Sequence, residues 1–590
     1  MTYPTERNIE ILLITNNDSD NVGDQVIEAC DISLIKTAAK NLSISEDNLE
    51  IESIALGIIP NSYCESNNPK LLEAAESRIK NATLVLFGGA PVFNYKYKYF
   101  YKKTAAILDL AKRHNKPVMF SAVGINDEFD AENEKCQTLK SALMNGAVKQ
   151  ATSRDGFGHL EKYARIGSFS SEDSADRFAF PIQLVSDPAV YTNAVFKNFS
   201  NQIKNQNTNT KIGLFVFRPG GFQDNGIRFS RIQQCIFWKD VCKKLEELGY
   251  DYELLTSGHF ADEANLQYLI DNKYVSEKKC VKNINTPEDL INRIQSYSGI
   301  ITCRLHPSII SFSYGIPCIS LVWNSKVTDF YSQIGYPDRA IPIDKLLFND
   351  CVSVSPVIDQ LESALQNGVQ KDSSYIESNY ITLLHGIASC LEIKQETYQP
   401  YYGKHITNNL IPYTGTTEKM KKEKIERKYT RCYRGYTDAR LHEAALKSSK
   451  KVIHRLLYHS GSPNVEINIH NFNGGSGIVD SLSSGNFEYR FAENIPNVGS
   501  NKFAPCGFVH KAKQFKGWKV RVKIENKWFW LVGHGGLIPK NEYSSSHATL
   551  FQPNETIPVL PVNRIECMVA EAVWNKKITG VINSRLFKNS

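Results

Sequence analysis

The sequence predicts an α/β protein with two similar halves, followed by a smaller β-rich region. Up to about residue 395, short apolar runs alternate with segments of helical spacing, which is typical of parallel sheets covered by helices on both faces. A polar, asparagine-rich stretch near residues 197–210 interrupts this alternation, which then starts again. After residue 461, glycine, asparagine and short alternating runs prevail, and this texture indicates short antiparallel strands.

The first half, residues 1–197, opens with the strand-like run IEILLIT, and a polar loop then leads into a helical pattern. The runs IESIALG, LVLFGG and PVMFSAV read as further strands, and segments of helical spacing separate them. Strands that are apolar throughout predict a sheet buried on both faces.

The second half, residues 210–395, begins with the strand-like run KIGLFVF and repeats the alternation. One of its helices has a clear start, with Thr286 as N-cap and Pro287 at the first position. Two such halves predict a cleft between them. In open parallel sheets, ligands bind beyond the carboxyl ends of the strands.

The remaining chain is expected to form a linker, residues 396–460, and a β-rich domain, residues 461–590. The linker is aromatic at first and then basic: residues 418–455 hold thirteen Lys/Arg against five Asp/Glu. The basic part, 418–457, is expected to be a helix, either with a solvated face or in peripheral contact with an anionic membrane surface. Clean alternation around Glu525–Asn526 predicts two strands.

Composition excludes several classes of protein. With 42% hydrophobic and 22% charged residues, most of the chain is expected to fold, and no run approaches a membrane span. The N-terminus does not resemble a signal peptide, so we expect a cytoplasmic protein. Thirteen cysteines without a CxxC pair predict no zinc site. The net charge of +7 is local, so we expect no nucleic-acid partner.

Polar residues gather where the predicted strands end. Asn21 and Asp24 follow the first strand, and the pair Gly88–Gly89 follows a later one. Gly88–Gly89 is either a phosphate-facing turn or a simple tight turn. The phosphate alternative is the weaker signal, because the pair lacks the spacing of known phosphate loops. Arg218 follows the first strand of the second half.

Arg304 and His306 end a later strand of the second half, just before Pro307. At positions i and i+2 of a strand both side chains would point to the same side. Together with the N-terminus of the next helix they predict an anion site. The alternative is structural, with Arg304 paired to a carboxylate and His306 capping the turn.

The segment 301–330, ITCRLHPSIISFSYGIPCISLVWNSKVTDF, resembles the signature of the polysaccharide pyruvyltransferase family. Four further stretches resemble family motifs in the right order: NVGDQVI, FGGAPVF with Ala90 in place of a third glycine, TSRD and SDPAVY. The resemblance spans roughly residues 10–390 and leaves the C-terminal extension unrecognised.

The resemblance implies two Rossmann-like domains in a GT-B-like arrangement, with the acceptor on the N-terminal side and the donor on the C-terminal side. It also implies a reaction. Phosphoenolpyruvate would donate its three-carbon unit to two hydroxyls of one sugar, in a cell-surface glycan or its lipid-linked precursor, giving a pyruvate ketal and phosphate. No cofactor beyond this donor substrate is expected.

The chemistry suits the residues at the strand ends. Phosphoenolpyruvate carries a carboxylate and a phosphate, and Arg218 and Arg304 are suited to hold them. His306 is the expected proton donor to the enol carbon, and Asp24 the expected base; Asp24 is otherwise an N-cap. Lys326 is a further anion contact or a surface lysine. The other expected substrate-binding residues are Asn21, Gly88, Gly89, His259 and Leu305.

Two other functions are kept open. The first is a GT-B-like glycosyltransferase that uses a nucleotide-sugar donor; Arg218 favours a compact, doubly anionic donor instead. The second is a scaffold that has lost its activity and carries a glycan-binding tail. The presence of Arg304 and His306 argues against it.

Overall fold

The structure is a computed structural model. It describes residues 8–420 apart from 20, 98, 167–176, 200–209, 219, 283, 349–350 and 419, and beyond them four strands. The chain divides into two compact units, Met1–Thr416 and Thr417–Ser590.

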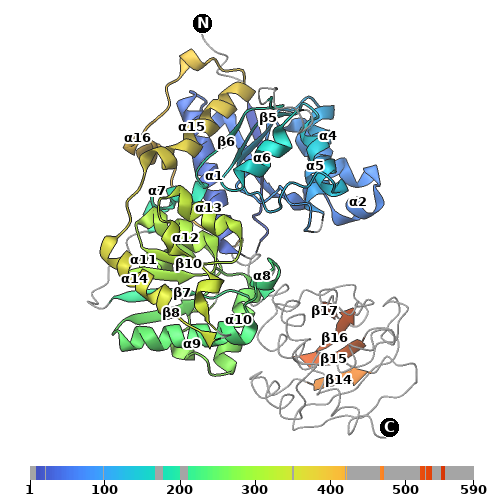
Figure 1. Cartoon of the computed structure of the whole chain (residues 1–590). Helices are drawn as coiled ribbons and strands as arrows, with labels where there is room; N and C mark the ends of the chain where they lie inside the picture. The colour runs from blue at the N-terminus through green and yellow to red at the C-terminus, as the bar shows by residue number, and fades with distance from the viewer. Residues whose placement is uncertain are drawn as a thin grey trace. The chain divides into compact units, whose positions relative to one another are not determined.

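The first unit contains a six-stranded parallel sheet in the order β2-β1-β3-β4-β5-β6. Figure 1 labels two of its strands, β5 and β6. Its strands are β1 (Ile9–Thr15), β2 (Leu49–Ala55), β3 (Leu84–Gly88), β4 (Val118–Val123), β5 (Val148–Ser153) and β6 (Ile182–Leu184). Every residue of β3 and β4 is buried, as expected for central strands covered on both faces.

A second parallel sheet follows in the same unit, in the order β11-β10-β9-β7-β8. Its strands are β7 (Lys211–Phe215), β8 (Asp251–Leu255), β9 (Gly299–Thr302), β10 (Cys318–Val322) and β11 (Ala340–Pro342). The predicted α/β class with parallel sheets is therefore confirmed. A short antiparallel pair, β12 (Leu347–Phe348) and β13 (Cys351–Val352), lies outside both sheets.

Helices connect the strands. The longer ones are α1 (Val22–Asn41), α3 (Glu73–Asn81), α4 (Phe100–Arg113), α5 (Glu134–Leu143), α6 (Phe157–Ala164), α9 (Arg231–Glu247), α10 (Phe260–Asp271), α11 (Pro287–Gln295), α12 (Leu305–Tyr314), α13 (Ser325–Gln333), α14 (Ser355–Asn367) and α15 (Ser373–Cys390). The shorter ones are α2 (Asn61–Ser66), α7 (Thr192–Val195), α8 (Gly220–Gln223) and α16 (Lys404–Asn409). Helix α11 starts as predicted, with Thr286 as N-cap and Pro287 in its first turn. None of the described helices combines the length and the apolar character that crossing a membrane requires.

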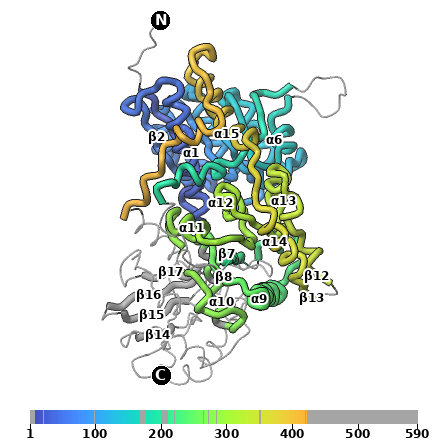
Figure 2. Tube along the Cα trace, turned by 90° about the vertical axis from the view of Figure 1, so that its left-hand side faces the viewer, coloured from blue at the N-terminus to red at the C-terminus, as the bar shows by residue number. Residues whose placement is uncertain are grey.

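Helix α15 follows the second sheet in sequence but lies beside the first (Figures 1 and 2). Asn379 of α15 donates to the carbonyl of Ser186 at 2.8 Å, and Gln150 of β5 donates to the carbonyl of Thr382 at 3.1 Å. The chain then runs along α1, where Ser33 donates to the carbonyl of Ile411 at 2.7 Å. Residues 396–416, which the sequence analysis assigned to a linker, thus belong to the first unit.

The carboxyl ends of the two sheets meet through their loops. The amide of Val22, after β1, donates to the carbonyl of Ser257, after β8, at 2.8 Å. On the other side, Gln333 of α13 donates to the carbonyl of Arg154, after β5, at 3.0 Å. The side chains that follow strands of both halves are therefore brought together, as the rule for parallel sheets predicts.

The second unit is described only as a four-stranded antiparallel sheet, β14-β15-β16-β17. Its strands are β14 (Glu466–His470), β15 (Trp518–Ile524), β16 (Lys527–His534) and β17 (His547–Phe551). Strands β15 and β16 pair on either side of residues 525–526, where the alternation placed a turn. The basic segment 421–457 lies outside the described residues, and the β-rich domain and the membrane contact stay predictions.

Candidate active site

Asn21 joins the two halves at the start of α1. It is the N-cap of this helix, so the alternative role of Asp24 as N-cap is wrong. The Asn21 Oδ1 atom accepts from Ser257 Oγ at 2.8 Å and from the Gly23 amide at 3.4 Å. These two donors fix the orientation of the amide, so Asn21 Nδ2 is the group that faces His306 Nδ1, at 2.9 Å.

The bond from Asn21 determines the tautomer of His306. Because Nδ2 of an asparagine can only donate, His306 Nδ1 accepts, and a neutral ring carries its proton on Nε2. That atom lies 3.6 Å from Asp24 Oδ1. The structure thus pairs the two residues that the sequence analysis named as acid and base, although they are far apart in sequence.

The chain turns earlier around Arg304 than the sequence predicted. Strand β9 ends at Thr302, and α12 begins at Leu305, with Arg304 as N-cap. The Thr302 hydroxyl accepts the Arg304 amide at 2.8 Å and closes a local turn. The expectation that Arg304 and His306 share one side of a strand is therefore wrong. His306 instead lies in the first turn of a helix, and Leu305 is buried in the core.

Burial and nearby charges shift the pKa values of His306 and Asp24 in opposite directions. Burial, with the nearby cations Arg154, Arg304 and Lys326, holds the pKa of His306 well below its ordinary 6.5. Burial also raises the pKa of Asp24 from 3.8 to about 6, although nearby hydrogen-bond donors and cations oppose the shift. Without a ligand, His306 is neutral at neutral pH, and Asp24 titrates close to neutrality.

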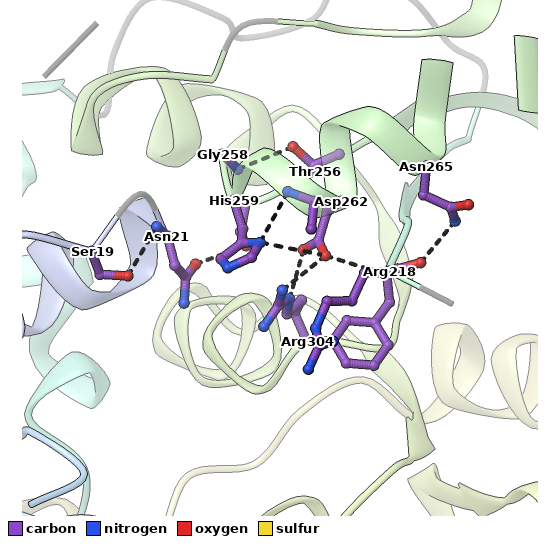
Figure 3. A network of polar contacts seen from close by, with 12 residues as sticks. Ser19, Asn21, Arg218, Thr256, Gly258, His259, Asp262, Asn265 and Arg304 are labelled. Atoms are coloured by element: carbon purple, nitrogen blue, oxygen red, sulfur yellow. Dashed lines mark hydrogen bonds and ion pairs between the residues drawn. The ribbon is translucent and has the colours of Figure 1, made fainter. Parts of the chain in front are cut away.

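Arg304 is held by a buried carboxylate. Its Nε and Nη2 atoms donate to the two oxygens of Asp262 at 2.7 and 2.8 Å, and its guanidinium lies 4.5 Å from the centre of the Phe217 ring (Figure 3). The Asp262 side chain has no exposed surface. Arg304 is therefore paired to a carboxylate, as the structural alternative stated. A contact between its remaining nitrogen and the donor stays a prediction.

Arg218 and His259 also converge on Asp262 (Figure 3). The Arg218 amide donates to Asp262 Oδ1 at 2.9 Å, while its guanidinium pairs with Asp224 and is 37% exposed. His259 is the N-cap of α10, and its Nδ1 accepts the Ala261 amide at 3.2 Å. The structure thus gives both residues local partners, and their predicted substrate contacts stay predictions.

Two buried cations from opposite halves, Arg154 and Lys326, approach each other beside Gly124, the residue that follows β4. A Cβ added to Gly124 would lie 2.9 Å from Lys326 Nζ and 3.3 Å from Arg154 Nη2. Arg154 Nη1 donates to Asp187 at 2.7 Å, and Lys326 Nζ lies 3.8 Å from Asp155. Lys326 is only 7% exposed, so its interpretation as a surface lysine is wrong. Burial lowers its pKa, against the opposing charge of Asp155.

Gly88 and Gly89 are required for packing. A Cβ on Gly88 would lie 2.7 Å from an Asp31 carboxylate oxygen, and one on Gly89 would lie 2.2 Å from Ile27. Gly89 also has a φ of +53°, which favours glycine. These glycines let α1 approach β3 closely, and a role in substrate binding stays a prediction.

Sequence reasoning missed Arg154, Asp262 and Ser257 as members of this site. Arg154 had a usable signal, because it follows a predicted strand in the same way as the residues that were chosen. Asp262 had none, since an acidic residue in the first turn of a helix is ordinary. Within the described ranges, no group of three His, Cys, Asp or Glu side chains could hold a metal ion.

The two parallel sheets and the site at their strand ends define an α/β protein with a composite site. A family model for polysaccharide pyruvyl transferase matches residues 8–325, more than half of the chain. The chain therefore belongs to the polysaccharide pyruvyl transferase family, and it is a transferase. The family resemblance seen in the sequence is confirmed.

Solved structures of other enzymes are also similar. The UDP-GlcNAc 2-epimerase of Methanocaldococcus jannaschii is 13% identical with a TM-score of 0.39, over 66% of this chain and 100% of its own. The ADP-heptose LPS heptosyltransferase II of E. coli is 13% identical with a TM-score of 0.33, over 61% and 99%. No curated protein matches the chain. The GT-B-like arrangement stays a prediction.

Proposed function

We propose that this transferase moves the enolpyruvyl unit of phosphoenolpyruvate onto two hydroxyls of one sugar of a cell-surface glycan or its lipid-linked precursor, giving a pyruvate ketal and phosphate. The observation that carries this proposal is the His306–Asp24 pair, 3.6 Å apart, with the cations Arg154 and Lys326 nearby. This pair would supply an acid and a base for the proton transfers, beside charges that suit an anionic donor.

The cations above Gly124 suit the donor. Arg154 Nη2 and Lys326 Nζ converge on one point, although like charges repel and burial disfavours both. Asp187 and Asp155 offset part of their charge. A phosphate or carboxylate at that point would offset more of it, and Arg can hold such a group in a bidentate manner. A third, partly buried cation, Arg304, adds one nitrogen that Asp262 does not hold.

Donor binding would change His306 from a neutral ring into an acid. Its pKa is low because burial and three cations disfavour the imidazolium. The negative charges of phosphoenolpyruvate would offset the cations and raise that pKa. Because an imidazolium carries a proton on both ring nitrogens, Asn21 would then have to turn its amide oxygen toward Nδ1, with Ser257 Oγ accepting from Nδ2. His306 then protonates C3 of the enol, which becomes a methyl group, and C2 becomes an oxocarbenium-like centre.

Asp24 would take the proton of the attacking hydroxyl. A carboxylate whose pKa is about 6 is ionised at neutral pH yet basic enough to accept a proton. The first hydroxyl oxygen bonds to C2, and the C2–O bond to phosphate then breaks. The second hydroxyl closes the ketal, and its proton leaves with phosphate. Asp24 returns the first proton to His306 across the gap between them.

A solvent-isotope experiment tests this scheme. The acceptor is the cell-surface polysaccharide of the source organism, freed of ketals by mild acid. With phosphoenolpyruvate in D₂O, we expect phosphate release and a ketal methyl group that carries one deuterium, detected by mass spectrometry. His306→Asn should abolish both. No phosphate release by the wild type, or a methyl group without deuterium, contradicts the proposal.

A further inference from the structure

The loop between β3 and α4 holds an exposed tyrosine on a fixed backbone. The Asp127 carboxylate accepts the amides of Tyr95 and Lys96 at 2.7 and 2.8 Å, and Asn94 Oδ1 accepts the amide of Tyr97 at 2.8 Å. The Tyr95 ring is buried and anchors the segment. Tyr97, by contrast, is 52% exposed, and its ring leans on that of Phe100, with centroids 5.6 Å apart.

This loop adjoins the candidate active site on the side of the first sheet. It runs beside the segment after β4, with the Gly124 amide donating to the carbonyl of Ala90 and the Asn126 amide to that of Phe93, both at 3.1 Å. Gly124 is the residue above which Arg154 and Lys326 converge. The exposed tyrosine therefore belongs to the same strand-end edge as the site.

We propose that Tyr97, with the exposed Lys96 beside it, forms a subsite for the acceptor glycan, in which a pyranose ring next to the sugar that receives pyruvate stacks on Tyr97. The inference rests on the proposed function, which requires a glycan on the side of Asp24. A tyrosine suits this task because it presents a large, rigid, amphipathic surface at low entropic cost. Lys96 adds a donor for sugar hydroxyls or an anionic substituent.

The backbone around Tyr97 is held in place by buried side chains. Single exposed aromatic residues are common on protein surfaces and need no explanation by themselves. Here, however, the buried Asp127 carboxylate holds the amides of the two residues before the tyrosine, and the buried Asn94 side chain holds the amide of the tyrosine itself. A ring that is already ordered before the ligand arrives loses less freedom on binding.

Affinity electrophoresis tests the subsite. The full-length protein migrates through native gels that contain the source organism's cell-surface polysaccharide, freed of ketals by mild acid. We expect this polysaccharide to retard the wild type and Tyr97→Ala to weaken binding by about tenfold, the loss expected for one stacked aromatic contact. Tyr97→Phe keeps the ring and should bind within about twofold of the wild type. Tyr402→Ala is the matched control, because Tyr402 is 57% exposed outside this loop.

Two outcomes overturn the subsite: Tyr97→Ala binds as the wild type does, or the polysaccharide retards no form of the protein. Stabilisation by phosphoenolpyruvate is measured on the same variants. This measurement distinguishes a wrong subsite from a wrong proposed function. If phosphoenolpyruvate stabilises all variants but Tyr97→Ala has no effect on retardation, only the subsite is wrong. If retardation depends on Tyr97 but phosphoenolpyruvate binds no variant, only the donor assignment is wrong.

Discussion

Gly23 is the position where one added carbon should separate the two halves. A Cβ there would lie 2.4 Å from both Cβ and Nδ1 of His306, whereas ordinary contact begins at 3.4 Å. The Cβ of His306 cannot escape by a change of rotamer, so α1 and α12 must move apart by about 1 Å, the difference between these distances. A displacement of that size at reacting groups costs about a hundredfold in rate. Gly23→Ala should therefore lower kcat about a hundredfold.

The assay is phosphate release from phosphoenolpyruvate with the de-ketalised polysaccharide as acceptor. Gly57→Ala is the matched control, because among the residues that the structure describes just one atom, an Asp18 oxygen at 4.0 Å, lies within 4 Å of its added Cβ. The control should keep its activity, and Gly23→Ala should also lose about 1–3 kcal/mol of unfolding free energy to overpacking. A Gly23→Ala enzyme with activity near that of the wild type would refute the close packing of α1 on His306.

Two further predictions concern buried charge. Asp24→Asn should be more stable than the wild type at pH 8, by up to about 3 kcal/mol, because a pKa raised from 3.8 to about 6 is a shift of roughly 2 units. The contribution of Asp24 to stability is present below pH 3.8 and is lost as the pH rises through about 6, so the advantage of the variant should appear across that window in urea unfolding. Asp262→Ala should cost about 3–5 kcal/mol, because it removes the fully buried carboxylate and leaves the partly buried Arg304 unpaired. Asp224→Ala removes only the exposed partner of Arg218 and should cost less than about 1 kcal/mol.

Clear outcomes would contradict these predictions. A stability difference between Asp24→Asn and the wild type that does not change between pH 3 and pH 8 would mean that Asp24 is not desolvated by burial. Equal losses for Asp262→Ala and Asp224→Ala in urea unfolding would mean that the Arg304–Asp262 pair is as well solvated as a surface pair.

The sequence was informative where a pattern is local. The strand-like run IEILLIT is β1, Ile9–Thr15, because a strand in the middle of a parallel sheet is nearly continuous in apolar residues. The rule that ligands bind beyond strand ends then selected Asn21, Asp24 and His306, which the structure brings together. The family resemblance added the chemistry that these residues suit.

Other parts of the site depend on contacts that no local pattern encodes. Lys326 could not be distinguished from a surface lysine in the sequence, because its burial comes from the other half of the unit, where Gly124 and Asp155 lie. Arg304 was placed on a strand because the apolar run continues past Thr302, while a single hydroxyl-to-amide bond ends the strand there. Its partner Asp262 could be found only once the first turn of α10 was placed beside the N-cap of α12.

Ligand-dependent stabilisation tests the central claim, that the buried cations around His306 hold phosphoenolpyruvate. The unfolding temperature is measured with phosphoenolpyruvate, with UDP-glucose and with UDP-N-acetylglucosamine, for the wild type and for Lys326→Met. We predict that only phosphoenolpyruvate stabilises the wild type, by about 2.7 kcal/mol at a hundred times its dissociation constant, and that Lys326→Met loses most of this shift. Stabilisation by a nucleotide sugar alone, or an unchanged shift in Lys326→Met, would contradict the claim.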